Sequence, residues 1–199
     1  MSSKASSISA ARRIAAPGQV RIIGGQWRRT PLPVPDKPGL RPTPDRVRET
    51  LFNWLGQDLT GWRCMDAFAG TGALGLEAAS RGAAQVLLVE QDPALAAQLQ
   101  AHQKRLKADA VRVQRGDGIA ALRQIAQTAP RSQHLVFLDP PFGAVELFAP
   151  ALQAAQQAVA EGGHIYLEAP AAWSAETTGL TLYRHLKAGA VHAHLLQVS

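Results

Sequence analysis

Apolar residues in this chain recur in short runs that alternate with stretches of helical periodicity. The runs predict strands at residues 63–68, 85–90, 110–114, 134–139 and 163–168. Between and beside them, the pattern predicts helices over residues 73–81, 92–107, 118–127 and 145–159. Nearly continuous apolar strands separated by amphipathic helices are typical of a parallel sheet that is covered on both faces.

The end of the chain departs from this alternation. Two strand patterns, at residues 180–186 and 190–198, flank Lys187-Ala188-Gly189, which predicts a β-hairpin. One of its strands must run antiparallel to its neighbour. We therefore predict a doubly wound α/β fold with a mostly parallel seven-stranded sheet and an antiparallel C-terminal edge hairpin.

The first sixty residues have a different pattern. Residues 1–19 are rich in Ser, Ala and Arg and predict a disordered basic tail, although the composition also suits a mitochondrial transit peptide. Residues 20–60 predict a small β-hairpin around Gly24-Gly25, followed by a helix. Thr43 is the expected N-cap of this helix, with Pro44 in its first position. Residues 61–199 then form the α/β domain.

Charge is concentrated in the same N-terminal part. The formal net charge is +6, and residues 1–50 hold ten basic side chains against three acidic ones, so the remaining 149 residues carry −1. Clustered Lys and Arg indicate a phosphate backbone as partner, and Trp27 among them can stack on an unpaired base. The alternative is a solvated arm that only aids solubility.

The single cysteine, the lengths of the apolar runs and the spacing of Cys and His limit the classes of protein to which the chain can belong. Cys64 is the only cysteine, which excludes an intramolecular disulfide and suits a reducing, cytoplasmic setting. Because Cys64 lies inside a predicted strand, we interpret it as a core residue and not as a nucleophile for covalent carbon methylation. No apolar run is long enough for a membrane helix, and no Cys/His cluster has zinc spacing, so we expect no membrane contact and no metal.

The first candidate site is the loop DAFAGTGALG, which follows a strand and opens a helix. Gly70 and Gly72 allow a tight turn and close approach of a ligand. Residues 70–75 also satisfy GxGxxG, so a nicotinamide or flavin site stays open. Asp66, at the end of the preceding strand, would repel a pyrophosphate but attract an ammonium group, which favours S-adenosylmethionine (SAM).

Two further carboxylates follow the next strands. Glu90 ends a strand where its oxygens can accept hydrogen bonds from a ribose diol, a role that suits NAD and SAM equally. Asp117 follows the third strand, where it can meet an adenine amino group or cap a helix, and both roles stay open.

The second candidate site is Asp139-Pro140-Pro141-Phe142, directly after a strand. Two prolines fix the backbone and remove N–H donors, which leaves carbonyls exposed. An amino group on a nucleobase ring is a poor nucleophile, so acceptors must orient it. The Asp139 carboxylate and the Pro140 carbonyl supply them, and Phe142 can stack on a flipped base.

These motifs together resemble those of a known family. DAFAGTGALGLEAASRG with LDPPF is similar to the class I SAM-dependent amino-methyltransferases, and VRIIGGQWRRTPLPVP…GLRPTPDRVRETLFNWL resembles the bacterial 16S rRNA guanine-N2 methyltransferases of the RsmD family. The resemblance covers residues 20–198 and implies a Rossmann-like SAM methyltransferase domain at 61–199 and an RNA-binding hairpin and helix at 20–60. It implies action on 16S rRNA in an assembling small ribosomal subunit. We expect a cytoplasmic monomer.

The resemblance also implies roles for individual residues. SAM would be bound by Asp66, Phe68, Gly70, Gly72, Glu90 and Asp117. The target guanine would be held by Asp139, Pro140 and Phe142. RNA would be contacted by Arg21, Trp27, Arg28 and Arg29, and at the entrance by Arg41, Thr43, Arg46 and Arg48.

Three other functions remain open from the residues alone. The same chemistry could act on adenine N6 in DNA or on a protein amide, because the Asp-Pro-Pro-Phe corner recognises a planar amino group. A dinucleotide-dependent oxidoreductase would use the glycine loop for pyrophosphate. A catalytically idle RNA-binding protein would have no need of Asp66, Glu90 and Asp139.

Overall fold

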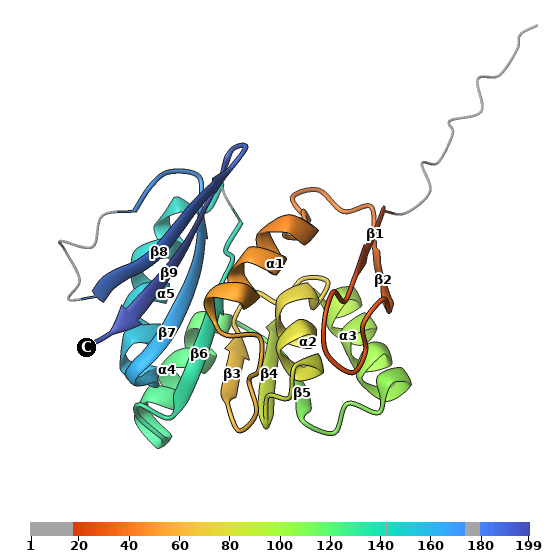
Figure 1. The fold of residues 1–199 in the computed structure, drawn as a ribbon, viewed down its shortest axis with the longest axis horizontal. Coiled ribbons are helices and arrows are strands. Elements are labelled where there is room, and N and C mark those ends of the chain that lie inside the picture. Colours follow the sequence, from red (N-terminus) through yellow and green to blue (C-terminus); the bar gives the residue numbers. More distant parts are fainter. Residues whose placement is uncertain (1–17, 142, 174–179) are drawn as a thin grey trace, which may run out of the picture.

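The computed structural model describes residues 18–141, 143–173 and 180–199. Within that part of the chain, a seven-stranded sheet has the order β5-β4-β3-β6-β7-β9-β8 (Figure 1). Its strands are β3 (Arg63–Asp66), β4 (Gln85–Glu90), β5 (Val111–Arg115), β6 (Gln133–Leu138), β7 (Val159–Ala169), β8 (Leu180–Ala188) and β9 (Val191–Val198). The strands from β5 to β7 are parallel, as the apolar runs predicted.

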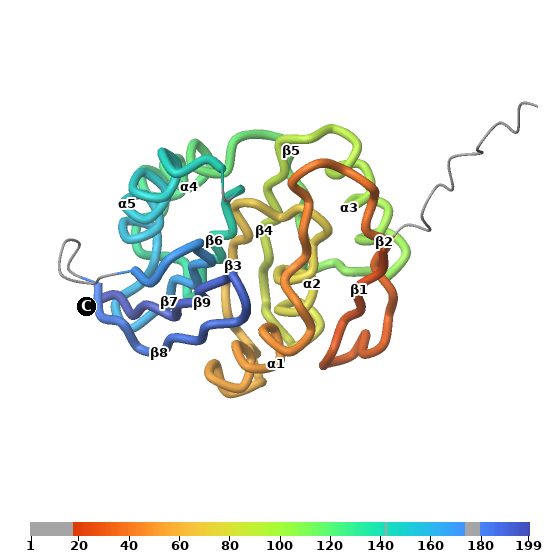
Figure 2. The backbone as a smooth tube through the Cα atoms, turned by 90° about the horizontal axis from the view of Figure 1, so that it is seen from above, coloured from red at the N-terminus to blue at the C-terminus, as the bar shows by residue number. Residues whose placement is uncertain are grey.

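Helices cover both faces of this sheet. They are α1 (Asp45–Trp54), α2 (Ala73–Ser80), α3 (Pro93–Leu106), α4 (Gly118–Thr128) and α5 (Phe148–Ala158), with a short 3-10 turn at Val145–Leu147 before α5. Seen from above, α1, α2 and α3 lie on one side of the sheet and α4 and α5 on the other (Figure 2). Two apolar clusters correspond to these two layers, one that includes Leu76 and Phe137 and another that includes Leu122 and Val136.

The structure confirms the C-terminal hairpin and shows the order of its strands in the sheet. Strand β9 pairs antiparallel with both β7 and β8, so the antiparallel strand lies between them and β8 forms the edge. The pairing of β9 with β7 runs from His164 to Ala169 on the β7 side. This seven-stranded doubly wound architecture is the one that the sequence predicted.

The N-terminal hairpin consists of β1 (Gly18–Arg21) and β2 (Pro31–Val34), which pair antiparallel. The predicted tail at residues 1–19 is therefore wrong at its end, because Gly18 and Gln19 already pair with β2; residues 1–17 lie outside the described residues. Leu32 and Ile22 are fully buried in the same apolar cluster as α2 and α3. The hairpin thus shares the core of the α/β domain.

The start of α1 differs from the prediction. Pro44 occupies the N-cap position and no side chain caps the helix. Thr43 is buried and its side chain hydrogen-bonds to Glu168 on β7 instead. Because that acceptor is distant in sequence, the local pattern could not distinguish it from a helix cap.

Candidate functional site

Four carboxyl groups gather at the carboxyl ends of neighbouring parallel strands. Asp66 ends β3, Glu90 ends β4, Asp139 follows β6, and Glu168 lies near the end of β7. β3 and β6 are adjacent in the sheet, and chain connections leave them in opposite directions. Ligands of open α/β sheets bind at such a reversal of strand order, so this edge is the candidate site.

Asp66 is the most deeply placed of these groups. Its side chain is buried, and Oδ2 accepts a hydrogen bond from the Gly75 N–H at 3.1 Å. Oδ1 is also buried and has no hydrogen-bond partner among the described residues. Burial raises the Asp66 pKa to about 7. A buried carboxylate oxygen without a partner is costly, so this atom is suited to receive a donor from a ligand.

The glycine loop has the conformation that the sequence predicted. Gly70 and Gly72 have φ values of 52° and 81°, in the left-handed region where a side chain is unfavourable. At Gly72, a Cβ atom would stand 2.6 Å from Leu99 Cδ2. The loop therefore requires glycine here both for its backbone conformation and for its packing on α3.

Glu90 orders the backbone around this loop. Its Oε2 accepts the Gly70 N–H at 2.8 Å, and its Oε1 accepts the Asp92 N–H at 2.7 Å. Each carboxylate oxygen can accept a second hydrogen bond, so Glu90 keeps acceptors for the predicted hydroxyl contacts. Asp117 is the N-cap of α4 and accepts the Ala120 N–H at 2.9 Å, which confirms its capping role and leaves its adenine contact a prediction.

Asp139 stands beside two other acidic groups. Burial raises its pKa well above the ordinary value, and the nearby carboxyl groups of Glu168 and Asp66 raise it further. Pro140 is buried and Pro141 is exposed, which gives a rigid corner at the end of β6. Phe142 lies outside the described residues.

Glu168 is a site residue that the sequence reasoning missed. It is buried, and Tyr166 Oη donates a hydrogen bond to Glu168 Oε1 at 2.8 Å. Burial raises its pKa, while the Thr43 and Tyr166 hydroxyls and the Arg48 charge act in the opposite direction. A glutamate at the end of a buried strand, beside the strand that carries Asp139, was the signal that could have found it.

The segment that leads into α1 crosses this edge of the sheet. Lys37 forms an ion pair with Asp92, at the start of α3. Leu40 lies over the glycine loop, since a Cβ at Gly70 would stand 3.3 Å from Leu40 Cδ1. The segment therefore borders the glycine loop at one end. At the other end, the Thr43 side chain hydrogen-bonds to Glu168.

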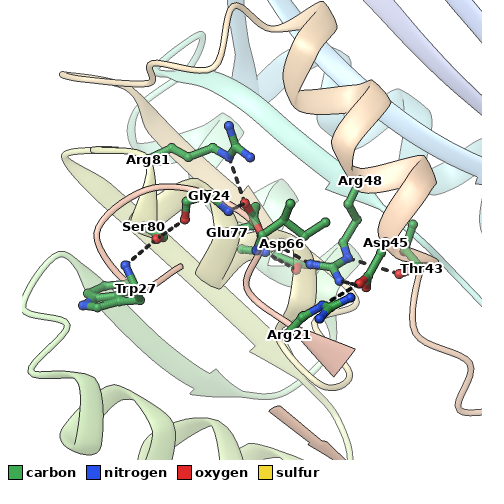
Figure 3. A network of polar contacts seen from close by, with 12 residues as sticks. Arg21, Gly24, Trp27, Thr43, Asp45, Arg48, Asp66, Glu77, Ser80 and Arg81 are labelled. Carbon is green, nitrogen blue, oxygen red and sulfur yellow. Dashed lines mark hydrogen bonds and ion pairs between the residues drawn. The ribbon is translucent and has the colours of Figure 1, made fainter. Parts of the chain in front are cut away.

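Glu77 on α2 connects this segment to the N-terminal hairpin (Figure 3). Its carboxylate is fully buried and accepts the N–H groups of Ile23 and Gly24, each at 2.7 Å. It also pairs with Arg48 Nη1 at 3.3 Å and Arg81 Nε at 2.9 Å. The hairpin loop, α1 and α2 thus share one buried acceptor.

The residues predicted to contact RNA fall into an exposed group and a buried group. Exposed side chains belong to Arg21, Arg28, Arg29, Arg41 and Arg46. Two other residues are buried, Arg48 at 0% and Thr43 at 3% exposure, and their contact with RNA stays a prediction. In the structure Arg48 pairs with Glu77, and the Thr43 side chain hydrogen-bonds to Glu168. Trp27 is half-buried and packs against the core beside the hairpin.

A second polar cluster lies on the C-terminal hairpin. His185, His192 and His194 bring ring nitrogens within 4.8 Å of one another. The planes of the three rings lie within 19° of parallel. His194 Nε2 already accepts the Trp173 N–H at 3.0 Å. His185 Nε2 and His192 Nδ1 lie 3.0 Å apart, so ring nitrogens of this cluster already have partners within the described residues.

Residues 20–197 match the protein family described as Conserved hypothetical protein 95. Over 125 residues, 63% of this chain, the sequence is 54% identical to Ribosomal RNA small subunit methyltransferase D of Escherichia coli, and the match covers 61% of that relative. The protein of the same name from Haemophilus influenzae is 46% identical over 64% of this chain and 66% of its own length. These matches thus span less than two thirds of either relative.

A solved structure has nearly the whole fold. The structure of an Escherichia coli protein superposes with a TM-score of 0.78 and 39% identity, over 92% of this chain and 99% of that chain. In the described part of this chain, no helix has the length and apolar character needed to cross a membrane.

Proposed function

The chain belongs to the Conserved hypothetical protein 95 family, and on that premise we propose that it transfers a methyl group from SAM to the exocyclic N2 amino group of a guanine in 16S ribosomal RNA. One observation carries the proposal: Asp66, with a buried oxygen that lacks a partner among the described residues, and Asp139, at a proline corner, end adjacent strands of the sheet. The names of the relatives point to ribosomal RNA of the small subunit.

The residues around the glycine loop fit SAM. Asp66 Oδ1 can accept a hydrogen bond from its ammonium group, and the open turn at Gly70 and Gly72 admits a close ligand. Glu90 and Asp117 retain acceptor capacity for the ribose hydroxyls and the adenine amino group. When bound, SAM supplies an electrophilic methyl group on a sulfonium sulfur.

The proline corner would hold the amino group to be methylated. The Asp139 carboxylate and the Pro140 carbonyl are acceptors for its two hydrogens, so its lone pair is directed away from them. Fixing the amine in this orientation replaces a bimolecular encounter with a positioned attack, which accounts for much of the rate of such reactions. Phe142 is the proposed stacking partner of the base.

The test separates cofactor binding from transfer. We expect Asp139→Ala to bind SAM with near wild-type affinity in calorimetry and to lose methyl transfer to small-subunit particles from a strain that lacks the gene. Glu161→Gln, which removes an exposed carboxylate at the far end of β7, is the control and should retain both properties. Full turnover by the Asp139→Ala variant would refute the assignment.

The product identifies the base and the polymer. Nucleoside mass spectrometry of RNA and DNA from the same strain should show loss of N2-methylguanosine from 16S rRNA. Loss of N6-methyladenine from DNA would instead support the alternative substrate, since an acidic-proline corner accommodates any planar amino group.

We further propose that the substrate is the assembling small subunit in the cytoplasm and that the protein acts as a monomer. The exposed arginines of the hairpin region would contact the phosphate backbone. Comparing methylation of naked 16S rRNA with that of assembled particles tests the first point, and sedimentation of the free protein tests the second.

A further inference from the structure

Asp139, directly after β6, and Glu168, on β7, occupy matching positions at the edge of the sheet. Leu138 on β6 pairs with Leu167 on β7, so the residues that follow, Asp139 and Glu168, lie beside each other at the edge of the sheet. Of the two acidic neighbours that raise the Asp139 pKa, Glu168 has the larger effect and Asp66 the smaller one. Two carboxyl groups this close do not both ionise readily.

The polar groups around Glu168 stabilise its ionised form. Glu168 receives hydrogen bonds from Tyr166 on its own strand and from Thr43 before α1, and it faces the positive charge of Arg48. All three favour its ionised form. Ala193, opposite Glu168 on β9, adds no charge, and His194 pairs with Leu167 and so points to the other face of the sheet.

The groups that influence Asp139 have the opposite effect. Glu168 on β7 and Asp66 on β3 are both acidic, whereas burial disfavours the charge of Asp139 and of Glu168 alike. Between the two neighbours, Glu168 therefore holds negative charge more easily and Asp139 holds the proton more easily. This asymmetry comes from Thr43, Tyr166 and Arg48, none of which needs to touch a substrate.

We propose that Glu168 is a positioning residue whose negative charge sets the pH at which Asp139 becomes a carboxylate able to accept hydrogen from the substrate amine. This inference rests on the proposed methyl transfer. In that step the N2–CH₃ bond forms and the S–CH₃ bond breaks, with its electron pair left on sulfur. The proton released from N2 passes to the Asp139 carboxylate and then to water, so no further reactant is needed.

The coupling can be measured on the protein alone. In protein labelled with ¹³C at the aspartate carboxyl carbons, the Asp139 signal is identified by its disappearance in Asp139→Asn. We expect its titration midpoint to fall by about one pH unit or more in Glu168→Gln, because a neighbouring negative charge is removed. Glu161→Gln removes a charge of the same type from the same strand, at an exposed position, and should leave the midpoint unchanged.

A second, milder variant tests the inference if Glu168→Gln does not fold. Tyr166→Phe keeps the ring and removes only the hydroxyl that donates to Glu168. Glu168 then ionises less readily, so the Asp139 midpoint should move in the same direction by a smaller amount. An unmoved midpoint in both variants, or an equal shift in Glu161→Gln, would overturn the inference.

Enzyme assays give an independent readout. The acid limb of the single-turnover pH profile should move to lower pH in Glu168→Gln, whereas a purely structural role would lower the rate equally at every pH. A shifted NMR midpoint without methyl transfer by the wild-type protein would refute the proposed function and keep the coupling. If the wild-type protein is active but Glu168→Gln shifts neither the acid limb nor the Asp139 midpoint, the coupling alone is refuted.

Discussion

Arg48 and Glu77 form an ion pair in which neither side chain is exposed to solvent, with Nη1 and Oε2 3.3 Å apart. Arg48 also reaches Asp45 Oδ1 at 2.6 Å and the Thr43 carbonyl at 3.1 Å. Burial lowers the Arg48 pKa, and the facing carboxylates of Glu77 and Asp45 oppose that effect. The ion pair therefore links α1 to α2, and each of the two buried charges is compensated by the other.

Glu77→Gln should destabilise the protein strongly. The amide removes the charge that compensates Arg48 and presents N–H groups to donors that had a carboxylate oxygen as acceptor. Removing one partner of a buried pair typically costs about 3–5 kcal/mol. Urea unfolding followed by circular dichroism should show this loss as a lower midpoint at an unchanged slope.

Hydrogen exchange should locate the effect of this variant. Because Ile23 and Gly24 donate directly to Glu77, amides in the hairpin should lose protection before those of the central strands. The exposed Glu161→Gln is the matched control and should stay within about 0.5 kcal/mol of wild type. A Glu77→Gln protein as stable as this control would show that the ion pair contributes nothing.

Asp66→Asn should weaken SAM binding while it relieves a burial cost. The variant loses the charged acceptor for the ligand ammonium group, which we expect to cost about 1.5–3 kcal/mol, or roughly 10- to 150-fold in dissociation constant. Calorimetry with SAM measures this change. Wild-type affinity in the variant would mean that Oδ1 does not meet the cofactor.

The pH dependence of stability should differ between wild type and Asp66→Asn. The Asp66 pKa is raised from 3.8 in the unfolded chain to about 7 in the folded protein. Between these values the folded state retains a proton that the unfolded state has lost, so wild-type stability falls as pH rises through this range. Relative to Asp66→Asn, the wild-type Tm should therefore decline from about pH 4 to 7 and level off above it.

Much of the fold could be predicted because local signals mark its elements. The helix predicted over residues 92–107 is α3, and Asp92 is its N-cap, accepting the N–H groups of Ala94 and Leu95. The apolar run before Asp139 is β6 as expected. Signals of this kind act within a few residues, so the chain alone contains them.

The errors arose where a polar residue is bound by a distant segment. Thr43 was interpreted as a cap because Thr before Pro is a helix-start pattern, but its acceptor is Glu168. The burial of Arg48 was not predicted either, because a charged side chain is rarely buried unless a partner such as Glu77 compensates it. A lone glutamate inside the apolar stretch of α2 was the available sign of such a partner.

Cys64 should be inert in the folded protein. Its side chain is 1% exposed, and burial raises its pKa to about 12, so both access and thiolate are lacking at pH 8. A chromogenic disulfide reagent should react only after denaturation, and Cys64→Ala should retain methyl transfer. Loss of transfer in a folded Cys64→Ala variant would instead indicate covalent chemistry through the thiol.

Arg28→Ala and Arg41→Ala should weaken RNA binding without affecting SAM binding. Both side chains are exposed, and each RNA phosphate that is no longer neutralised by an arginine should reduce the slope of log affinity against log salt by about 0.7–0.9. Arg123→Ala removes an exposed arginine from α4, on the other side of the sheet, and is the matched control that should leave the slope unchanged. Equal slopes in all three variants would assign the basic residues to solubility, because counterion release follows only from phosphates that the protein touches.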